Sequence, residues 1–228
     1  MLNSLDKKII HDIIRWDVKN WKNARPFWEA HFSIKPGMHV LVLGDREGGL
    51  SLYFALKGCI VTCTELKSPL DEAKIIHQKY GLSEVITYEK ADMSRLQYHD
   101  AQFDIVAFKS VIGALTESEA QAGAILEMKR VLKTGGAILF AENSNGSLLH
   151  KILRRKFVKW SKYWKYNSDK DFSNWQKEFS SGHLKKFGFF GLFGRSEKQR
   201  NVLGSIDATF GRMFPLSWRY ICFGLFIK

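Results

Sequence analysis

The chain has 228 residues, of which 45% are hydrophobic and 25% charged, as in a folded globular protein and unlike a disordered one. Its 35 Lys and Arg residues outnumber 23 Asp and Glu residues, and the net charge of +12 favours an anionic partner: nucleic acid, a phosphorylated substrate or an acidic membrane surface. The length suits one α/β domain, no apolar run reaches the roughly 18 residues of a spanning helix, and the charged N-terminus does not resemble a signal peptide, so we expect a cytoplasmic protein.

The three cysteines, Cys59, Cys63 and Cys222, lie in apolar, strand-like segments. An odd number of cysteines without the spacing of zinc ligands is typical of a cytoplasmic protein with reduced thiols. We therefore predict buried, unpaired thiols and no metal site.

Residues 6–32 are predicted to form one or two amphipathic helices, with Ile9, Ile13 and Trp16 on the apolar side and a break at Pro26. We expect residues 1–35 to be a helical cover over one edge of the sheet. A lid over a substrate pocket is the alternative role of this segment.

The next stretch has the pattern of a βαβ unit. Residues 40–43 form an apolar run, residues 44–49 a glycine-bearing turn, residues 51–57 a helical pattern and residues 59–64 a second apolar run. Such a unit brings the backbone N–H groups of a helix N-terminus close to a ligand. Glu65 ends the second strand, where an acid commonly binds the ribose hydroxyls of a nucleoside cofactor. These residues predict a pocket for such a cofactor.

Strands and helices continue to alternate up to residue 142. The pattern predicts helices over 69–80 and 117–132, strands over 85–89, 103–108 and 137–141, and a Gly-Gly turn over 133–136. This alternation favours a Rossmann-like, doubly wound, mostly parallel sheet with helices on both faces. Ligands of such sheets bind beyond the carboxyl ends of the strands, and these ends carry Gly44, Glu65, Asp92, Lys109 and Glu142.

Residues 148–166 are rich in Lys and Arg and contain no acid, while apolar residues recur at helical spacing. We interpret the segment as a basic amphipathic helix whose apolar stripe, which includes Ile152, Phe157 and Trp160, faces the core. Its basic face would be solvated, would contact an anionic membrane surface, or would bind a phosphorylated substrate. Nucleic acid is less favoured because the aromatic residues fall on the apolar stripe and not among the basic ones.

The tail completes the predicted sheet. Residues 187–193 are predicted as a sixth strand, residues 197–213 as a helix and residues 218–227 as a final, antiparallel strand at the sheet edge. The expected fold is thus a seven-stranded sheet with an antiparallel last strand.

The turn and the strand-end acids together resemble the class I S-adenosylmethionine-dependent methyltransferases. In that family the glycines of the first turn surround the methionine part of the cofactor, and the Gly-Gly turn before the fifth strand, here residues 133–136, is a recurrent motif. The resemblance implies that Glu65 binds the ribose and Asp92 meets the adenine. Val42 stands where the family has an acid, a charge that Asp45 or Glu47 could replace.

A dinucleotide cofactor is disfavoured by Arg46, which occupies the position of the second glycine in the dinucleotide fingerprint. The resemblance therefore selects S-adenosylmethionine. The candidate cofactor-binding residues are Gly44, Asp45, Arg46, Gly48, Gly49, Glu65, Leu66, Ala91, Asp92, Met93 and Lys109.

Methyl transfer to a sugar hydroxyl would need a general base. Glu142 and His150 are the candidates, with Lys109 and Asn143 as orienting groups. The turn sequence and the residues SWRY near the C-terminus also resemble, more weakly, methyltransferases of bacterial surface-polysaccharide synthesis.

We therefore predict an S-adenosylmethionine-dependent methyltransferase, an O-methyltransferase of a sugar or glycan-type acceptor. Residues 36–228 would form the methyltransferase domain, with a cofactor half over 36–142 and a substrate half over 143–228. The protein would be cytoplasmic, with peripheral contact at the inner face of the membrane through residues 148–166. The alternatives are an RNA-binding or RNA-methylating protein and a non-catalytic, membrane-associated relative.

Overall fold

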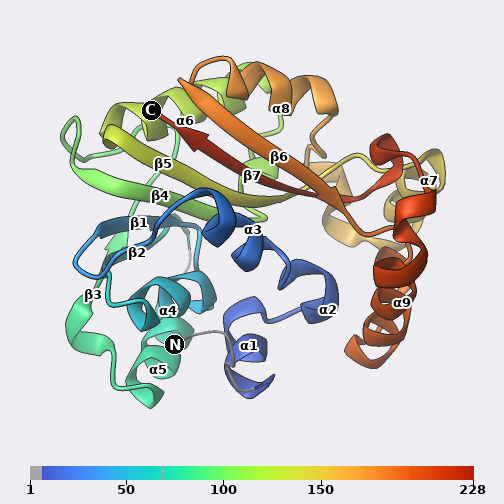
Figure 1. Cartoon of the computed structure of the whole chain (residues 1–228), viewed down its shortest axis with the longest axis horizontal. Helices are drawn as coiled ribbons and strands as arrows, with labels where there is room; N and C mark the ends of the chain where they lie inside the picture. The colour runs from blue at the N-terminus through green and yellow to red at the C-terminus, as the bar shows by residue number, and fades with distance from the viewer. Residues whose placement is uncertain (1–6, 68) are drawn as a thin grey trace.

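The computed structural model describes residues 7–67 and 69–228, which form one twisted sheet with helices on both faces (Figure 1). The strands are β1 His39–Leu43, β2 Ile60–Glu65, β3 Ile86–Lys90, β4 Phe103–Lys109, β5 Leu132–Asn143, β6 Ser181–Phe187 and β7 Ile221–Ile227. Their order in the described chain is β3-β2-β1-β4-β5-β7-β6. β7 runs antiparallel to β5 and β6, whereas β1 to β5 pair in parallel. The predicted fold class is confirmed, although β7 is inserted one position inside the edge, which β6 forms.

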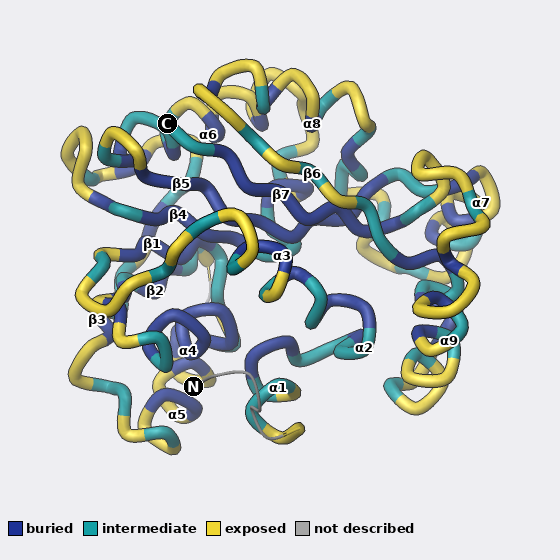
Figure 2. Tube along the Cα trace, viewed as in Figure 1, coloured by how far each residue is buried: buried dark blue, intermediate teal, exposed yellow. Residues whose placement is uncertain are grey.

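Helices cover both faces because successive strand residues point to opposite sides. The helices are α1 Lys7–Ile14, α2 Val18–Trp21, α3 Ala24–His31, α4 Gly49–Leu56, α5 Asp71–Lys79, α6 Ser118–Val131, α7 Leu148–Phe157, α8 Asp169–Gln176 and α9 Glu197–Phe210. Val40 and Val42 pack with α1, α3, α4 and α5, while Leu41 and Leu43 pack with α6 and α8. Figure 2 shows the inner strands β1, β4, β5 and β7 buried along most of their length, between helices whose outer faces are exposed, whereas the edge strands β3 and β6 are largely half-buried or exposed. The continuous apolar run of β1 therefore supplies two cores at once.

Short 3-10 helices join several elements. They are η1 Ser83–Val85, η2 Ile112–Ala114, η3 Lys159–Tyr163, η4 Gly191–Phe193, η5 Gly211–Met213 and η6 Leu216–Trp218. Cys59, Cys63 and Cys222 are buried and free, as predicted.

The break in the N-terminal segment does not occur at Pro26. That residue lies in the first turn of α3, where proline is well tolerated. The chain instead turns at Arg15 and Asp17, which have φ values of 71° and 45°. Left-handed backbone is costly for a residue with a Cβ, so this turn is held by the contacts around it. Residue 6, where the predicted helix begins, lies outside the described residues.

The Gly-Gly turn persists as an irregularity inside β5. Phe103 pairs with Leu132 but Ile105 pairs with Ala137, so residues 133–136 bulge out of the ladder. Gly135 has a φ of +76°, which only glycine adopts without strain.

The prediction for residues 148–166 is wrong in two respects. α7 ends at Phe157 and η3 follows, so the segment is not one helix. Its apolar residues also face outward, with 53% of Ile152 and 51% of Trp160 exposed. His150 and Arg154 are buried in their place because both side chains satisfy backbone groups of neighbouring loops. The predicted strand at 187–193 is also displaced: β6 ends at Phe187, and α8 was not predicted.

Candidate active site

The strand order changes direction between β1 and β4, and ligands of doubly wound sheets bind at such a switch point. The glycine-bearing turn lies at the end of β1. Asp45 accepts hydrogen bonds from the backbone N–H groups of Leu50 (3.2 Å) and Ser51 (2.7 Å), so its carboxylate caps the first turn of α4. The Asp45 N–H donates to the Thr64 carbonyl (2.9 Å) and ties the turn to β2.

Glu65 and Asp92 lie side by side at the ends of β2 and β3. The Ala91 N–H donates to the Glu65 carbonyl (3.4 Å), and Asp92 lies two residues beyond Lys90, the last paired residue of β3. One oxygen of Glu65 accepts from the Leu66 N–H (2.9 Å). Both carboxylates are half-buried, and within the described chain the second oxygen of each has no hydrogen-bond partner. Two adjacent acceptors of this kind suit the hydroxyl and amino groups of a nucleoside.

Ser94 donates two hydrogen bonds to the carboxylate of Asp92. Its hydroxyl (2.7 Å) and its backbone N–H (2.9 Å) both donate to the same Asp92 oxygen, and these bonds lower the pKa of Asp92 below its usual value. Ala91 is buried and Leu66 and Met93 are half-buried beside the two acids. The nucleoside end of the site thus combines negative charge with apolar walls.

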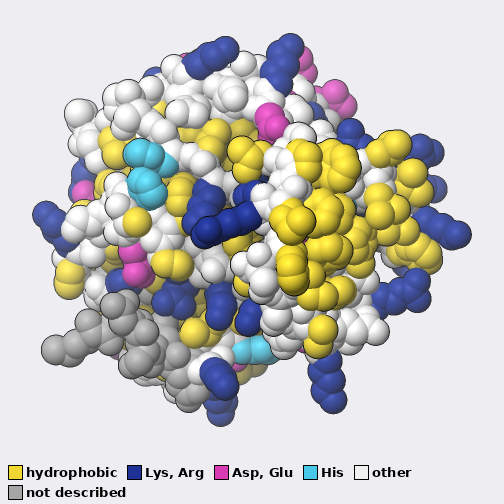
Figure 3. Space-filling model, turned by 45° about the vertical axis from the view of Figure 1, so that its right-hand side comes forward, with side chains coloured by type: hydrophobic (Ala, Val, Ile, Leu, Met, Phe, Trp, Pro, Cys, Tyr) yellow, Lys and Arg dark blue, Asp and Glu magenta, His cyan; other side chains and the backbone are white. Residues whose placement is uncertain are grey.

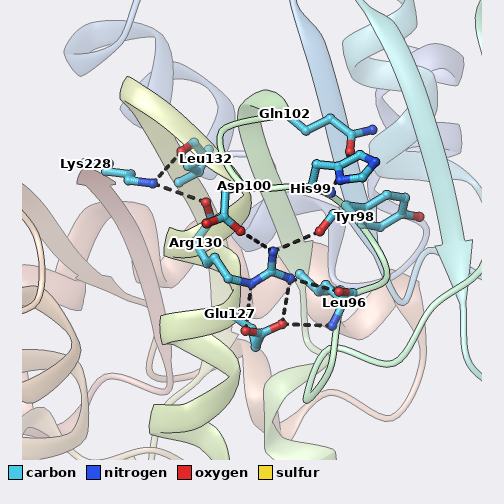
Figure 4. A network of polar contacts seen from close by, with 9 residues as sticks. All are labelled: Leu96, Tyr98, His99, Asp100, Gln102, Glu127, Arg130, Leu132 and Lys228. Atoms are coloured by element: carbon cyan, nitrogen blue, oxygen red, sulfur yellow. Dashed lines mark hydrogen bonds and ion pairs between the residues drawn. The ribbon is translucent and has the colours of Figure 1, made fainter.

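Arg130 fixes the loop that follows Asp92 (Figure 4). Its guanidinium pairs with Glu127 (2.9 Å) and Asp100 (2.7 Å) and donates to the carbonyls of Leu96 and Tyr98 (2.9 Å each). Since Arg130 belongs to α6, the network joins the nucleoside end of the site to a helix of the core.

The N-terminal segment covers the other end of the site. Lys109 Nζ donates to the Ile14 carbonyl (2.8 Å) and lies 5.6 Å from the centre of the Trp16 ring. Arg15 pairs with Glu47 (2.9 Å) in the glycine-bearing turn. Burial lowers the pKa of Lys109 to about 8. Among the candidate cofactor-binding residues, Arg46 is exposed and bonds only to Glu47 within the described chain (3.4 Å).

The glycines of the turn are required by close packing. A Cβ at Gly49 would lie 2.2 Å from the Ile13 carbonyl oxygen, and one at Gly44 would lie 2.6 Å from the Val111 side chain. The Gly48 carbonyl faces His77 Nε2 at 2.8 Å. The turn, α1 and the end of β4 are therefore in direct contact.

Glu142 is buried and serves the protein's own backbone. Its carboxylate accepts from the N–H groups of Val111 (2.8 Å), Ile112 (3.1 Å) and Asn143 (2.7 Å). Burial raises the pKa of Glu142 to about 7, against the effect of these donors. Asn143 Nδ2 donates to the Ser110 hydroxyl (2.7 Å). Both residues hold the loop after β4 against the end of β5, which is a positioning role and not that of a base with access to an acceptor.

His150 is likewise used within the protein. Its Nδ1 accepts from the Ser147 N–H (3.0 Å) at the start of α7, and its Nε2 donates to the Phe189 carbonyl (2.9 Å). The ring stacks on Phe193 and is buried, which lowers the pKa of His150 to about 4. Because both nitrogens are occupied, His150 is a structural residue here and cannot take a proton from an acceptor.

A cavity of about 560 Å³ opens beside Asn143, at the end of β5. It is lined by Trp16, Asn143, Leu153, Arg154, Phe157, Val158, Trp160, Tyr166, Leu192, Phe193, Gly194, Arg195 and Arg200. Of these residues the sequence singled out only Asn143 as part of the site. A signal for Arg154 was present: it follows His150 by one helical turn, so both occupy one face of α7.

Part of the chain is similar in sequence to known proteins. Residues 41–140 match the model of a family described as methyltransferase domain. The ubiquinone/menaquinone biosynthesis C-methyltransferase UbiE of Shewanella sp. (strain W3-18-1) is 30% identical over 139 residues, which are 58% of this chain and 53% of that protein. The counterpart in Shewanella frigidimarina is 27% identical over 161 residues, 67% of this chain and 60% of the relative. The chain thus spans somewhat more than half the length of these curated relatives.

Solved structures share the fold over most of the chain. Haemonchus contortus phosphoethanolamine N-methyltransferase 2, in complex with S-adenosyl-L-methionine, superposes with a TM-score of 0.65 at 15% identity, over 91% of this chain and 52% of its own. The PH0226 protein of Pyrococcus horikoshii superposes with a TM-score of 0.63 at 14% identity, over 99% of this chain and 92% of the Pyrococcus chain. Residues 41–140 are therefore similar to the methyltransferase domain family, and the chain as a whole shares the fold of these solved structures.

Proposed function

We propose that this protein transfers a methyl group from S-adenosylmethionine to a small-molecule acceptor. The observation that carries the proposal is the pair of half-buried acids, Glu65 and Asp92, at the ends of adjacent strands beside the switch point. Residues 36–142 would hold the cofactor and residues 143–228 would form the acceptor side.

The residues present fit the nucleoside part of the cofactor. Glu65 would accept hydrogen bonds from the ribose hydroxyls, and Asp92 from the adenine side, between the apolar walls of Leu66 and Met93. When bound, S-adenosylmethionine supplies an electrophilic methyl group on a sulfonium, so the protein's task is to align the acceptor and exclude water.

Access to the methionine end requires the N-terminal segment to move. The Lys109 bond to Ile14 and the Arg15 pair with Glu47 close this end in the present arrangement. Arg15 and Asp17 have left-handed backbone, and an opening that returned them to right-handed backbone would release strain of roughly 1–3 kcal/mol per residue. The predicted cover over residues 1–35 would thus also act as a lid.

Calorimetric titration with S-adenosylhomocysteine tests the assignment. Glu65→Ala and Asp92→Ala should each weaken binding about tenfold or more, since a hydrogen bond to a charged group contributes roughly 1.5–3 kcal/mol. Glu84→Ala, an exposed acid in η1, should leave the affinity unchanged. Wild-type affinity in both site variants would rule out the proposed nucleoside end.

We propose that the methylated atom of the acceptor is either an oxygen or a carbon. The sequence predicts the hydroxyl of a sugar or glycan-type acceptor in bacterial surface-polysaccharide synthesis, whereas the curated relatives are named C-methyltransferases. A sugar hydroxyl needs a base, and among the described residues that line the cavity there is no carboxylate or imidazole. An acceptor that is ionised at neutral pH would need none. NMR of a product carrying a labelled methyl group separates O-methyl from C-methyl products.

We also propose that an anionic membrane surface binds the face formed by α7, η3 and the 3-10 helices η5 and η6 before β7. Figure 3 shows hydrophobic side chains gathered on this face, with Lys and Arg side chains around them. The exposed large hydrophobic residues of these segments are Leu148, Leu149, Ile152, Phe157, Trp160, Tyr163, Met213, Leu216 and Trp218. Apolar residues rimmed by cations suit the boundary between headgroups and acyl chains.

This contact would be peripheral. In residues 7–67 and 69–228 no helix has both the length and the apolar character needed to cross a membrane. The cytoplasmic location stays a prediction, and so does contact with the inner face of the membrane.

A further inference from the structure

The cavity beside Asn143 is lined by arginine side chains that are paired with aromatic rings. Each of its three arginines lies over an aromatic ring that also lines it. The guanidinium carbon is 3.9 Å from the ring centre of Tyr166 for Arg154, 4.8 Å from that of Phe157 for Arg195, and 5.7 Å from that of Trp16 for Arg200. Stacking of this kind orients a guanidinium while leaving its N–H groups at the ring edge free to bind an anion.

Arg154 is the most buried of the three arginines, and its charge has no ion-pair partner in the described chain. It is only 3% exposed, and its Nη1 donates to the carbonyls of Ser144 (2.6 Å) and Asn145 (3.0 Å). Its Nη2 is buried and has no hydrogen-bond partner in the described chain. No carboxylate among the described residues forms an ion pair with it. A buried charge without a counter-charge is costly, and burial accordingly lowers the pKa of Arg154 to about 10.

Arg200 and Arg195 extend the positive charge along the wall. Arg200 Nε donates to the Gly194 carbonyl (3.1 Å), and its Nη1 is 3.9 Å from Glu197, a loose pair. Arg195 is exposed at the rim and has no ion-pair partner in the part of the chain that the structure describes. The cavity is therefore net positive, which attracts an anion.

The size and place of the cavity match a methyl acceptor. A volume of about 560 Å³ falls within the roughly 300–1,000 Å³ usual for small-molecule sites. Asn143, on its wall, bonds to Ser110 at the end of β4, next to the strand ends where the cofactor is proposed to lie. Trp16, on another wall, belongs to the segment that covers the methionine end.

We infer that this cavity binds the methyl acceptor and that the acceptor is a planar aromatic anion, whose carboxylate or phosphate pairs with Arg154 and Arg195 and whose ring stacks on the lining aromatic residues. The inference rests on the proposed methyltransferase function. An acidic hydroxyl or carbon acid of such a molecule loses its proton to solvent. The resulting anion forms the bond to the methyl carbon, and the electron pair of the broken carbon–sulfur bond stays on sulfur.

Binding of 2-naphthoate without cofactor, followed by calorimetry and by tryptophan fluorescence, tests the inference. The wild-type protein should bind 2-naphthoate at least tenfold more tightly than neutral 2-naphthamide and non-aromatic cyclohexanecarboxylate, because each control lacks one of the two contacts. 2-Naphthyl phosphate, compared with 2-naphthoate, shows which anionic group the site prefers.

Variants then assign the contact to named arginines. Arg154→Lys should weaken 2-naphthoate binding about tenfold, since lysine keeps the charge but loses the planar fork. Arg195→Gln should weaken 2-naphthoate binding at least threefold. Because Arg195 is exposed at the rim of the cavity, we expect this variant to fold as the wild type does. Arg155→Gln, on the exposed side of α7, should bind as the wild type does. Circular dichroism establishes that each variant is folded.

Two results would overturn the inference: equal affinity for 2-naphthoate and 2-naphthamide, or wild-type affinity in folded Arg154→Lys and Arg195→Gln. If Arg154→Lys does not fold, the inference is tested by the affinity of Arg195→Gln for 2-naphthoate and by the affinities of the wild-type protein for 2-naphthoate, 2-naphthamide and cyclohexanecarboxylate. Because these titrations contain no cofactor, failure of the cavity assignment is distinct from failure of the methyltransferase function, which is read from S-adenosylhomocysteine binding.

Discussion

At the scale of single residues, three of the side chains predicted to be catalytic or orienting groups bond to the protein's own backbone. Glu142, Lys109 and His150 each satisfy backbone groups that would otherwise be buried without partners. Sequence position identified these residues as polar groups near the crevice, but it could not show which way they face. Glu65 and Asp92 differ because each keeps an oxygen free of partners within the described chain.

Asp17 makes a pH-dependent contribution to stability. It is buried between Asn20 and the Tyr220 hydroxyl, near Asp207, Glu197 and Arg200, and burial raises the pKa of Asp17 from 3.8 to about 7. The folded state therefore holds this proton more tightly than the unfolded state. Stability from Asp17 is fully present below pH 4 and is lost as the pH rises to about 7.

We predict that Asp17→Asn gains stability relative to the wild type as the pH rises from 4 to 7, on the order of 2–4 kcal/mol across that range. Urea denaturation at several pH values measures the difference in the free energy of unfolding between the two proteins. Because both proteins contain His150, its opposing contribution to the pH dependence cancels in this difference. The exposed variant Glu84→Gln should run parallel to the wild type. A constant difference between Asp17→Asn and the wild type would contradict the assignment.

At the scale of elements, those whose burial pattern is set by their own sequence were predicted well. The strands β1, β2 and β4 and the helix α6 lie within one or two residues of their predicted ranges, because continuous apolar runs and a 3.6-residue period fix which face is buried. α7 was predicted with the wrong face buried. Its apolar stripe is exposed because His150 and Arg154 bond to backbone carbonyls outside the helix, at Phe189 and Ser144, which periodicity does not reveal.

The contact between α1 and the start of α4 leads to a prediction on two glycines. Gly49→Ala should destabilise the protein by about 1–3 kcal/mol, since its Cβ would lie 2.2 Å from the Ile13 carbonyl. Gly123→Ala, in α6 with no atom within 4 Å of its Cβ, should stabilise it by about 0.5–1 kcal/mol. Urea denaturation measures both. Equal effects of the two substitutions would show that α1 does not pack on the glycine turn.

At the scale of the whole molecule, the cavity and the apolar face are products of the tertiary fold. Trp16, Asn143, Arg154 and Arg195 meet in one cavity although they come from four separate segments. The sequence predicted the cofactor half because its motifs are local and follow consecutive strands. It placed the acceptor side in residues 143–228 but could not predict the lining of the cavity, which depends on how α7, η3 and η4 pack together.

The exposed face should bind vesicles. Wild-type protein should co-sediment with phosphatidylglycerol-containing liposomes, and Ile152→Asp should lower the partition coefficient about tenfold, because a buried Ile contributes roughly 1.5–3 kcal/mol. Ile75→Asp is the matched control: Ile75 is 68% exposed on α5, away from this face, and Ile152 is 53% exposed. Equal loss of binding in both variants, or binding that is independent of the anionic lipid, would contradict the proposal.

The most direct test of the central claim is calorimetric titration of the wild-type protein with S-adenosylhomocysteine and, separately, with NAD. The account predicts saturable binding of one S-adenosylhomocysteine per chain and no measurable binding of NAD, because Arg46 replaces the glycine that a pyrophosphate requires. An absence of S-adenosylhomocysteine binding, or NAD binding of equal affinity, would contradict it.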